Sequence, residues 1–364
     1  MTIDSVDVSV YEFPLEEPES DGTLTWDSTT MVVVEVAAGD ARGLGYTYGS
    51  AACATVIREK LADVVVGTDP MDATRTWSAM QRAVRNVGRP GVVSHAMSAV
   101  DTSVWDLKAR LLEVPLATLL GGVHDAVPVY GSGGFTSMSD QQMEKQLSEW
   151  VHELGIPRVK IKVAEDWGRR ERRDLARAEL ARRVIGADAE LFVDANGGYS
   201  RKQAVRMARR FSDHGVTWFE EPVSSDDLDG LHEIRDLVDQ DVAAGEYGYD
   251  LAYFRHMLAA GAVDCLQADV TRCGGVTEFL RVAGLAAAQG LELSAHTAAA
   301  LSLAPSAAIP NLRHVEWFAD HAAIEAAALD GAPTPEGGML RPDRSRPGNG
   351  LALKRSDIEQ FRKG

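Results

Sequence analysis

Basic residues are in short supply in this sequence. Its 364 residues include 37 lysines and arginines against 54 aspartates and glutamates, which gives a formal net charge of −17 at pH 7. Nucleic acids and anionic membranes bind proteins through basic patches. The charge balance therefore argues against both classes of partner, and it is compatible with a protein that concentrates a divalent cation.

Cysteine and long apolar runs are also scarce. The three cysteines, Cys53, Cys265 and Cys273, are too few and too scattered for a disulfide framework or a zinc knuckle. The opening MTIDSVDVSVYEFPLEEP carries acids where a signal peptide needs a basic end and an apolar run. No stretch reaches the length of a membrane span. We therefore expect a cytoplasmic protein with no membrane partner.

The length of the chain and its changing pattern predict more than one domain. Residues 1 to about 50 alternate like strands, in IDSVDVSVYEF and TMVVVEVAAGDARGLGYTY, and the polar segment PLEEPESDGTLTW between them is expected as a loop. From about 56 to 121 the pattern becomes helical. Strands followed by helices are typical of a compact α+β unit, which we place at residues 1–125.

From residue 127 onward, short apolar stretches alternate with amphipathic helical patterns. The strand candidates are VPVYGS, RVKIKV, LFVDAN, TWFEEP, DVAAGE, CLQADV, LELSAH and RHVEWF. This alternation predicts an α/β protein with a parallel (β/α) barrel of TIM type, of seven to eight strands, over residues 126–322. A doubly wound open sheet is the alternative, but the sequence has no glycine fingerprint for a dinucleotide. The turn-rich tail, 323–364, is expected to pack back onto both domains.

Residues that can do chemistry stand at the ends of these strands. They are Lys160, Lys162, Asp194, Asn196, Glu220, Glu246, Asp269, His296 and Glu316. In a parallel barrel the C-terminal ends of all strands meet at one mouth, where the active site lies. Lys160 and Lys162 are two residues apart, so both point to the same side of their strand, either into the barrel or toward solvent.

Three acids on adjacent strands, Asp194, Glu220 and Glu246, predict a metal site. Each acid alone would more often cap a loop, but hard oxygen ligands from three strands suit one Mg²⁺ per subunit. Glu221, next to the proposed ligand Glu220, is expected to meet a lysine or to support the ligands from behind.

His296 and Asp269 lie at the ends of neighbouring predicted strands. A carboxylate beside an imidazole fixes its tautomer and raises its basicity, which indicates a catalytic histidine. Lys162 and His296 would then flank the metal from opposite sides, with one base on each face of a bound carbon. Glu316, if protonated, would donate a hydrogen bond to a substrate carboxylate.

The motifs VKIK, VDAN, WFEEP, GE, QAD, SAH and VEW, in this order and spacing, resemble those of the enolase superfamily. The His–Asp dyad and the glutamate as third ligand are similar to those of its mandelate racemase subgroup. AMSAVDTSVWDLKARLLEVPLATLLGG resembles the helices of the family's capping domain, which the N-terminal region and the C-terminal tail would build together.

The resemblance implies a role for each strand-end residue. It implies Mg²⁺ on the three acids, Lys162 as one base and His296 with Asp269 as the other. Lys160 and Glu316 would contact the carboxylate of a small-molecule substrate. The capping-domain loops 15–28 and 45–54 would add substrate contacts. The expected contact residues besides Lys160 and Glu316 are Trp26, Tyr46, Ser132 and Asn196. A homo-oligomer is also expected.

The implied first step is removal of the proton α to a carboxylate, which gives an enediolate. Loss of a β-hydroxyl would make the protein an acid-sugar dehydratase, which is the favoured interpretation. Return of a proton from the opposite base would make it a racemase or epimerase. A cycloisomerase is a further alternative, to which GYTYG in the second loop lends slight support. A catalytically inactive metal-binding scaffold would lack a base or a ligand, and all of them are present.

Overall fold

The N-terminal strands form an antiparallel sheet. In the computed structural model, which describes residues 1–363, the order of this sheet is β15-β1-β2-β3. The strands are β1 (Ser5–Ser20), β2 (Thr25–Ala38), β3 (Ala41–Tyr48) and β15 (Arg362–Lys363). Tyr11 pairs with Arg362, so the end of the chain returns to the edge of this sheet, as predicted for the tail.

A group of helices follows the sheet and covers one of its faces. They are α1 (Ala52–Val56), a π-helix (Ile57–Leu61), α2 (Ala62–Val65), a 3-10 turn (Pro70–Asp72), α3 (Ala73–Ala83), α4 (Val92–Leu111) and α5 (Leu116–Leu119). Neighbouring residues of a strand point to opposite faces. Val32 and Val34 accordingly pack with α1 to α4, whereas Met31 and Val33 belong to the apolar cluster that continues into the barrel.

Helix α4 lies unusually close to β3, and two glycines make this possible. A Cβ atom on Gly43 would lie 2.1 Å from the carbonyl oxygen of Ser103, and one on Gly45 would lie 2.2 Å from that of Ala99. Any side chain at either position would push the helix off the sheet. The close approach fixes the capping helices against β3, whose last residues begin the segment 45–54.

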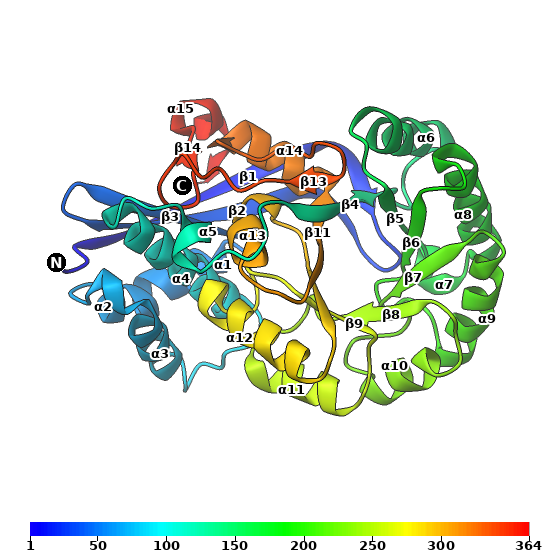
Figure 1. Cartoon of the computed structure of the whole chain (residues 1–364), viewed down its shortest axis with the longest axis horizontal. Helices are drawn as coiled ribbons and strands as arrows, with labels where there is room; N and C mark the ends of the chain where they lie inside the picture. The colour runs from blue at the N-terminus through cyan, green and yellow to red at the C-terminus, as the bar shows by residue number, and fades with distance from the viewer. Residues whose placement is uncertain (364) are drawn as a thin grey trace.

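A closed barrel of eight parallel strands follows within residues 1–363 (Figure 1). The strands run in sequence order from β4 to β11, and β11 pairs with β4 to close the ring. Their bounds are β4 (Val127–Gly133), β5 (Arg158–Lys162), β6 (Glu190–Asp194), β7 (Val216–Glu220), β8 (Asp241–Ala244), β9 (Cys265–Ala268), β10 (Glu292–Ala295) and β11 (Leu312–Phe318). The barrel prediction is confirmed, and an open sheet is excluded.

Helices surround the barrel, as the green and yellow ribbons of Figure 1 show. They are α6 (Asp140–Ser148), a π-helix (Glu149–Glu153), α7 (Glu165–Gly168), α8 (Glu171–Ile185), α9 (Arg201–Ser212), α10 (Leu228–Arg235), α11 (Leu251–Ala259), α12 (Gly275–Ala288), α13 (Ala299–Ala307) and α14 (Ala319–Ala328). In α9, a Ser200–Gln203 capping box starts the helix, and Ala204, Met207 and Phe211 form its buried stripe.

The C-terminal tail is tied down by short elements. They are β12 (Leu329–Asp330), β13 (Met339–Leu340), β14 (Ala352–Leu353), α15 (Arg355–Ile358) and a 3-10 turn (Glu359–Phe361). β13 runs antiparallel to β4, so the tail touches the barrel as well as the capping sheet. The boundaries predicted at residues 125 and 322 stay predictions. Within residues 1–363, every helix falls short of the length or the apolar character that a membrane crossing demands.

The loop prediction for PLEEPESDGTLTW was wrong. β1 continues to Ser20 and β2 begins at Thr25, with a shift of register between Pro14 and Glu19. On both sides of this shift the two arms pair, Pro14 with Ser28 and Glu19 with Trp26, so polar side chains are compatible with strand pairing here. The hairpin carries the turn at 21–24 out to the barrel.

Candidate active site

The register of the barrel strands sets a row of functional side chains at one level. Lys162 of β5 lies opposite Asp194 of β6, and Asp194 lies opposite Glu220 of β7. These residues are the last of their strands, so they stand at the C-terminal mouth. Glu246 follows β8 by two residues and reaches the same place.

An aromatic layer closes the barrel beneath this row. Side chains two residues apart on a strand share a face, so Phe192 and Trp218 line the interior one step below Asp194 and Glu220. Together with Tyr130 they form a separate buried cluster. The Trp218 indole Nε1 donates to Glu220 Oε2 at 2.9 Å. The layer excludes water from below and orients one carboxylate.

The three predicted ligands, Asp194, Glu220 and Glu246, are brought together. Each offers a carboxylate oxygen, these oxygens lie within 4.8 Å of one another, and all three side chains are buried. Burying three carboxylates at this spacing is costly unless positive charge meets them. The structure thus has a buried metal site built from hard oxygen donors.

The charge of the surrounding network supports the same conclusion. Six acids form or border the site: Asp194, Glu220, Glu221, Glu246, Asp269 and Glu316. Four basic side chains contact them within the described residues: Lys160, Lys162, Arg272 and His296. The acids outnumber the basic groups even with His296 protonated, so an excess of negative charge is left for a cation to neutralise. The residues present fit such an ion.

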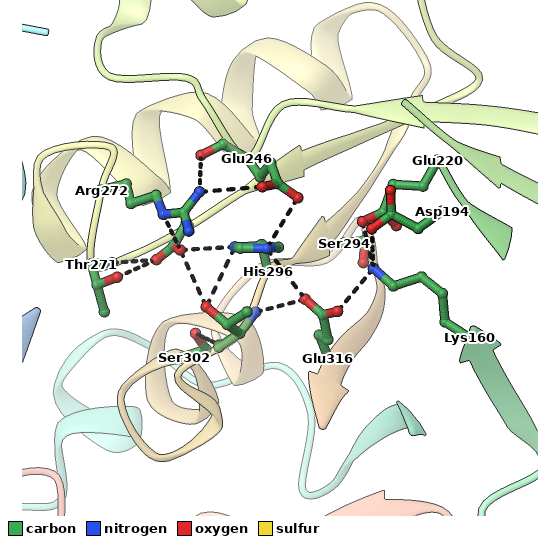
Figure 2. A network of polar contacts seen from close by, with 12 residues as sticks. Lys160, Asp194, Glu220, Glu246, Thr271, Arg272, Ser294, His296, Ser302 and Glu316 are labelled. Atoms are coloured by element: carbon green, nitrogen blue, oxygen red, sulfur yellow. Dashed lines mark hydrogen bonds and ion pairs between the residues drawn. The ribbon is translucent and has the colours of Figure 1, made fainter. Parts of the chain in front are cut away.

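Lys160 is completely buried, and its ammonium lies among Asp194, Glu220 and Glu316 (Figure 2). Its Nζ lies 2.8 Å from Glu316 Oε1 and 3.7 Å from Asp194 Oδ2, and it also donates to Glu220. Burial alone would lower the pKa of Lys160, but Glu220 and Glu316 raise it well above its ordinary value. Lys160 is therefore a fixed positive charge between β7 and β11.

Lys162 also points into the barrel mouth, so the solvent-facing alternative for the lysine pair is excluded. Its Nζ donates to Asp194 Oδ2 at 2.5 Å. Burial opposes the charged form, but Asp194 raises the pKa of Lys162 above its ordinary value. Unlike Lys160, Lys162 lines an open cavity above the site.

His296 and Asp269 form a buried dyad. His296 Nδ1 lies 2.8 Å from Asp269 Oδ2, and its Nε2 lies 3.2 Å from Glu246 Oε2. Burial would lower the pKa of His296, but Glu246 and Glu316 raise it to about 10. The backbone N–H and hydroxyl of Thr271 both donate to Asp269 Oδ1, which holds the carboxylate in place.

Lys162 and His296 each contact a different member of the acid triad. Lys162 contacts Asp194 on β6, whereas His296 contacts Glu246 beyond β8. Glu316 Oε2 accepts from the backbone N–H of Thr297 at 3.0 Å. Burial would raise the pKa of Glu316, but Lys160 and His296 lower it to about 2. These neighbours favour the ionised form of Glu316 in this network, and its predicted hydrogen bond to a substrate carboxylate stays a prediction.

Glu221 departs from expectation in one respect. It is buried with a positive φ of 38°, and its Oε1 has no hydrogen-bond partner within residues 1–363. The expected lysine contact is therefore absent there. Burial, reinforced by Glu246 and Asp194, raises the pKa of Glu221 well above its ordinary value. Glu246, Asp194 and Glu220 all act on it electrostatically, and the expected support of the ligands from behind stays a prediction.

A cavity of about 440 Å³ opens above the site. Two of the predicted substrate contacts, Trp26 and Asn196, line it. Ser132 is buried in β4, and its Oγ has no partner within the described chain. Tyr46 is not among the lining residues, because its hydroxyl donates to Glu325 at 2.6 Å, and Tyr48 lines the cavity in its place. All four substrate roles stay predictions.

Three side chains that contact the site residues were not predicted from the sequence. Arg272 Nε lies 3.2 Å from Asp269 Oδ2 and its guanidinium also reaches Glu246, so it bridges dyad and triad. It stands three residues after Asp269, a spacing that was available as a signal. Trp218 stands two residues before Glu220 on the same face. Thr271 gave no signal, since its role depends on the turn after β9.

Models of known families match most of the chain. The model described as Mandelate racemase / muconate lactonizing enzyme, N-terminal domain, matches residues 5–121. The model described as Enolase C-terminal domain-like matches residues 142–357.

Relatives of known structure or named activity are similar over nearly the whole length. A mandelate racemase/muconate lactonizing enzyme-like protein from Rubrobacter xylanophilus is 48% identical, with a TM-score of 0.96 and 100% of both chains covered. 3,6-Anhydro-alpha-L-galactonate cycloisomerase from Streptomyces coelicolor is 31% identical over 96% of this chain and 97% of its own.

L-talarate/galactarate dehydratase from Salmonella typhimurium is 31% identical over 87% of this chain and 82% of its own. A structure of that enzyme liganded with Mg and L-lyxarohydroxamate has a TM-score of 0.90 at 28% identity, and the match covers 100% of this chain and 93% of that one.

Proposed function

This chain belongs to the enolase superfamily, in its mandelate racemase and muconate lactonizing enzyme subgroup, and we propose that it is an Mg²⁺-dependent acid-sugar dehydratase. One observation carries the proposal. A buried triad of carboxylates lies between Lys162 and His296, which contact it over different ligands. That arrangement suits proton removal from one face of a carbon and proton delivery at the other.

The three acids Asp194, Glu220 and Glu246 would hold the ion. When bound, Mg²⁺ supplies positive charge for the oxygens of the substrate carboxylate, which become more negative as the α-proton leaves. Lys160 adds a fixed positive charge from the opposite side, next to Glu316. The aromatic layer under the row excludes water, which strengthens both effects.

Lys162 takes the proton from the α-carbon in this proposal, as the neutral amine. Asp194 raises the pKa of Lys162, and a cation held by Asp194 would oppose that rise by offsetting the carboxylate charge. The electron pair of the C–H bond moves into the carboxylate to give the enediolate. It then returns to form the α,β double bond while the β C–O bond breaks. His296, as the imidazolium held by Asp269, gives its Nε2 proton to the departing hydroxyl, which leaves as water. The enol product becomes a 2-keto acid.

The relatives support the reaction class and also keep the alternatives open. One is named a dehydratase of acid sugars and one a cycloisomerase, at 31% identity each. A racemase or epimerase would use the same two nitrogens, with a proton returned in place of water loss. We favour dehydration because the dehydratase relative has a structure named as liganded with Mg and L-lyxarohydroxamate, which supports an Mg²⁺ ion and a sugar-derived acid at the matching site of this chain. A cytoplasmic location and a homo-oligomeric state belong to the same proposal.

A screen of sugar acids tests the proposal. Purified protein with Mg²⁺ is incubated with a library of aldonic and aldaric acids, and 2-keto products are measured with semicarbazide. Turnover that disappears with a chelator and returns with Mg²⁺ is the expected result. Isomerised products without 2-keto acid would select the racemase or cycloisomerase, and full turnover in chelator would overturn the metal dependence.

A further inference from the structure

The cavity above the site has walls of opposite charge. Its barrel wall carries the basic groups Lys162, Arg272 and His296 beside the proposed metal ligand Glu246, whereas the wall from the capping hairpin and from α14 carries only acids, Asp21 and Asp320. A substrate that places one carboxylate at the barrel wall must direct its other end toward the acidic wall. The charge of that wall therefore selects the chemistry of the distal group.

The positive charges of the barrel wall already have partners. Lys162 Nζ contacts Asp194 Oδ2 at 2.5 Å. Arg272 contacts Asp269 at 3.2 Å and Glu246 at 3.3 Å. None of these groups is free to turn across the cavity and neutralise a second anion on a ligand.

The acids of the opposite wall have only neutral donors. Asp320 Oδ2 accepts from the hydroxyl of Thr29 at 2.5 Å, and Asp21 Oδ1 accepts from the backbone of Thr23 and Leu24. Neither acid has an ion pair with a lysine, arginine or histidine within residues 1–363. Asp320 lies in the first turn of α14, where the helix dipole favours a negative charge.

A further acid stands close to Asp320. Burial and the neighbouring Asp320 raise the pKa of Glu19 to about 8. Burial also raises the pKa of Asp320 itself, which the Thr29 hydroxyl opposes. Burial and mutual repulsion thus disfavour negative charge at this wall, so an anionic group on a ligand would meet the same cost.

Polar atoms without partners line the same end of the cavity. The rings of Tyr48 and His321 stack with centroids 3.6 Å apart, and both side chains are more than nine-tenths buried. The Tyr48 hydroxyl and His321 Nδ1 have no hydrogen-bond partner within the described residues. Buried polar atoms are normally paired, so these two point to a polar group on a ligand.

We infer that the substrate is a polyhydroxy monocarboxylate of the aldonic type, with hydroxyl groups donating to Asp21 and Asp320, and that aldaric diacids are excluded by this wall. The inference rests on the proposed function and narrows its substrate class. A carboxylate accepts hydrogen bonds and cannot donate them when ionised, so a distal hydroxyl fits the wall and a distal carboxylate does not. Repulsion between like charges in a partly buried cavity lowers binding on the order of a hundredfold.

Matched pairs of acids test the inference. D-gluconate with D-glucarate, and D-galactonate with galactarate, differ within each pair only in the oxidation of the distal carbon. Their affinity for the Mg²⁺-loaded protein is measured by titration calorimetry, and exchange of the α-proton is followed separately in D₂O. We expect at least one monoacid to bind about a hundredfold more tightly than its diacid partner.

A charge-removing variant tests whether Asp320 causes the preference for monoacids. Asp320→Asn should reduce the monoacid preference at least about tenfold, whereas Asp40→Asn, an exposed acid in the β2–β3 turn, should leave it unchanged. Equal or tighter binding of the diacids, no binding of any monoacid, or equal effects of the two variants would overturn the inference. Binding with the expected preference but without α-proton exchange of any bound acid would instead refute the proposed function.

Discussion

Replacing Lys160 with methionine should have opposite effects on stability and on metal binding. Methionine nearly matches the length of lysine and removes its charge. In the metal-free protein, Glu220 and Glu316 would then lie buried without the cation that contacts both. In the Mg²⁺-loaded protein, the same change removes a positive charge that competes for the ligand Glu220.

The size of the first effect follows from burial. Lys160 is 0% exposed and Glu316 1% exposed, with Nζ 2.8 Å from Oε1. Removing one partner of a buried ion pair costs about 3–5 kcal/mol because the other charge is left uncompensated. Each kcal/mol of lost unfolding free energy lowers the melting temperature by about 2–4 °C, so the metal-free variant should melt on the order of 10 °C lower than the unaltered protein.

Thermal unfolding with chelator and with Mg²⁺ measures both effects. Mg²⁺ should raise the melting temperature of the variant by more than it raises that of the unaltered protein. The reason is that tighter binding of Mg²⁺ to the folded state stabilises that state more. Its kcat/KM should fall on the order of 10²–10³, the cost of losing one charge-stabilising donor. Lys202→Met, on the exposed face of α9, is the matched control. Equal melting of variant and control in chelator, or a smaller gain from Mg²⁺, would refute the reasoning.

Two further predictions concern the ligands and the pH dependence of stability. Glu220→Gln should weaken Mg²⁺ binding in titration calorimetry on the order of a hundredfold or more, and Glu221→Gln far less; equal losses would mean that the wrong glutamate was assigned. Burial raises the pKa of Asp101 from 3.8 to about 7, although Thr277 donates to it twice. The folded state thus binds this proton more tightly than the unfolded state, so stability falls as the pH rises from about 4 to about 7. Urea unfolding at the two ends of this range should show a smaller fall for Asp101→Asn, and the same fall in both proteins would contradict the assignment.

The barrel could be predicted because its pattern is local. Each βα unit repeats an apolar run and a helical stripe, and the last strand residues, such as Asp194 and Glu220, fall in register at one level. Parallel topology then brings them to a single mouth without further information. The metal site followed from the same rule, since three acids at or just after the ends of adjacent strands have few other reasons to be there.

The parts that could not be predicted depend on long-range pairing. The polar hairpin arm ending at Ser20 looked like a loop, because its pairing partner and not its own composition makes it a strand. β13 pairs with β4 across about 210 residues, and no periodicity marks so short a strand. Arg272 lies in a turn, and its reach toward Glu246 and Asp269 depends on the path of that turn.

The central claim is that Lys162 and His296 serve a carbon α to a carboxylate held at the metal site. The most direct measurement is α-proton exchange in D₂O, with Mg²⁺ and a bound acid, for the unaltered protein and for Lys162→Met and His296→Asn. Exchange by the unaltered protein is predicted, with Lys162→Met losing it and His296→Asn retaining it while dehydration stops. Complementary exchange of the two enantiomers would identify a racemase. Equal exchange of one enantiomer by both variants would contradict the account, because neither residue would then be the base assigned to it.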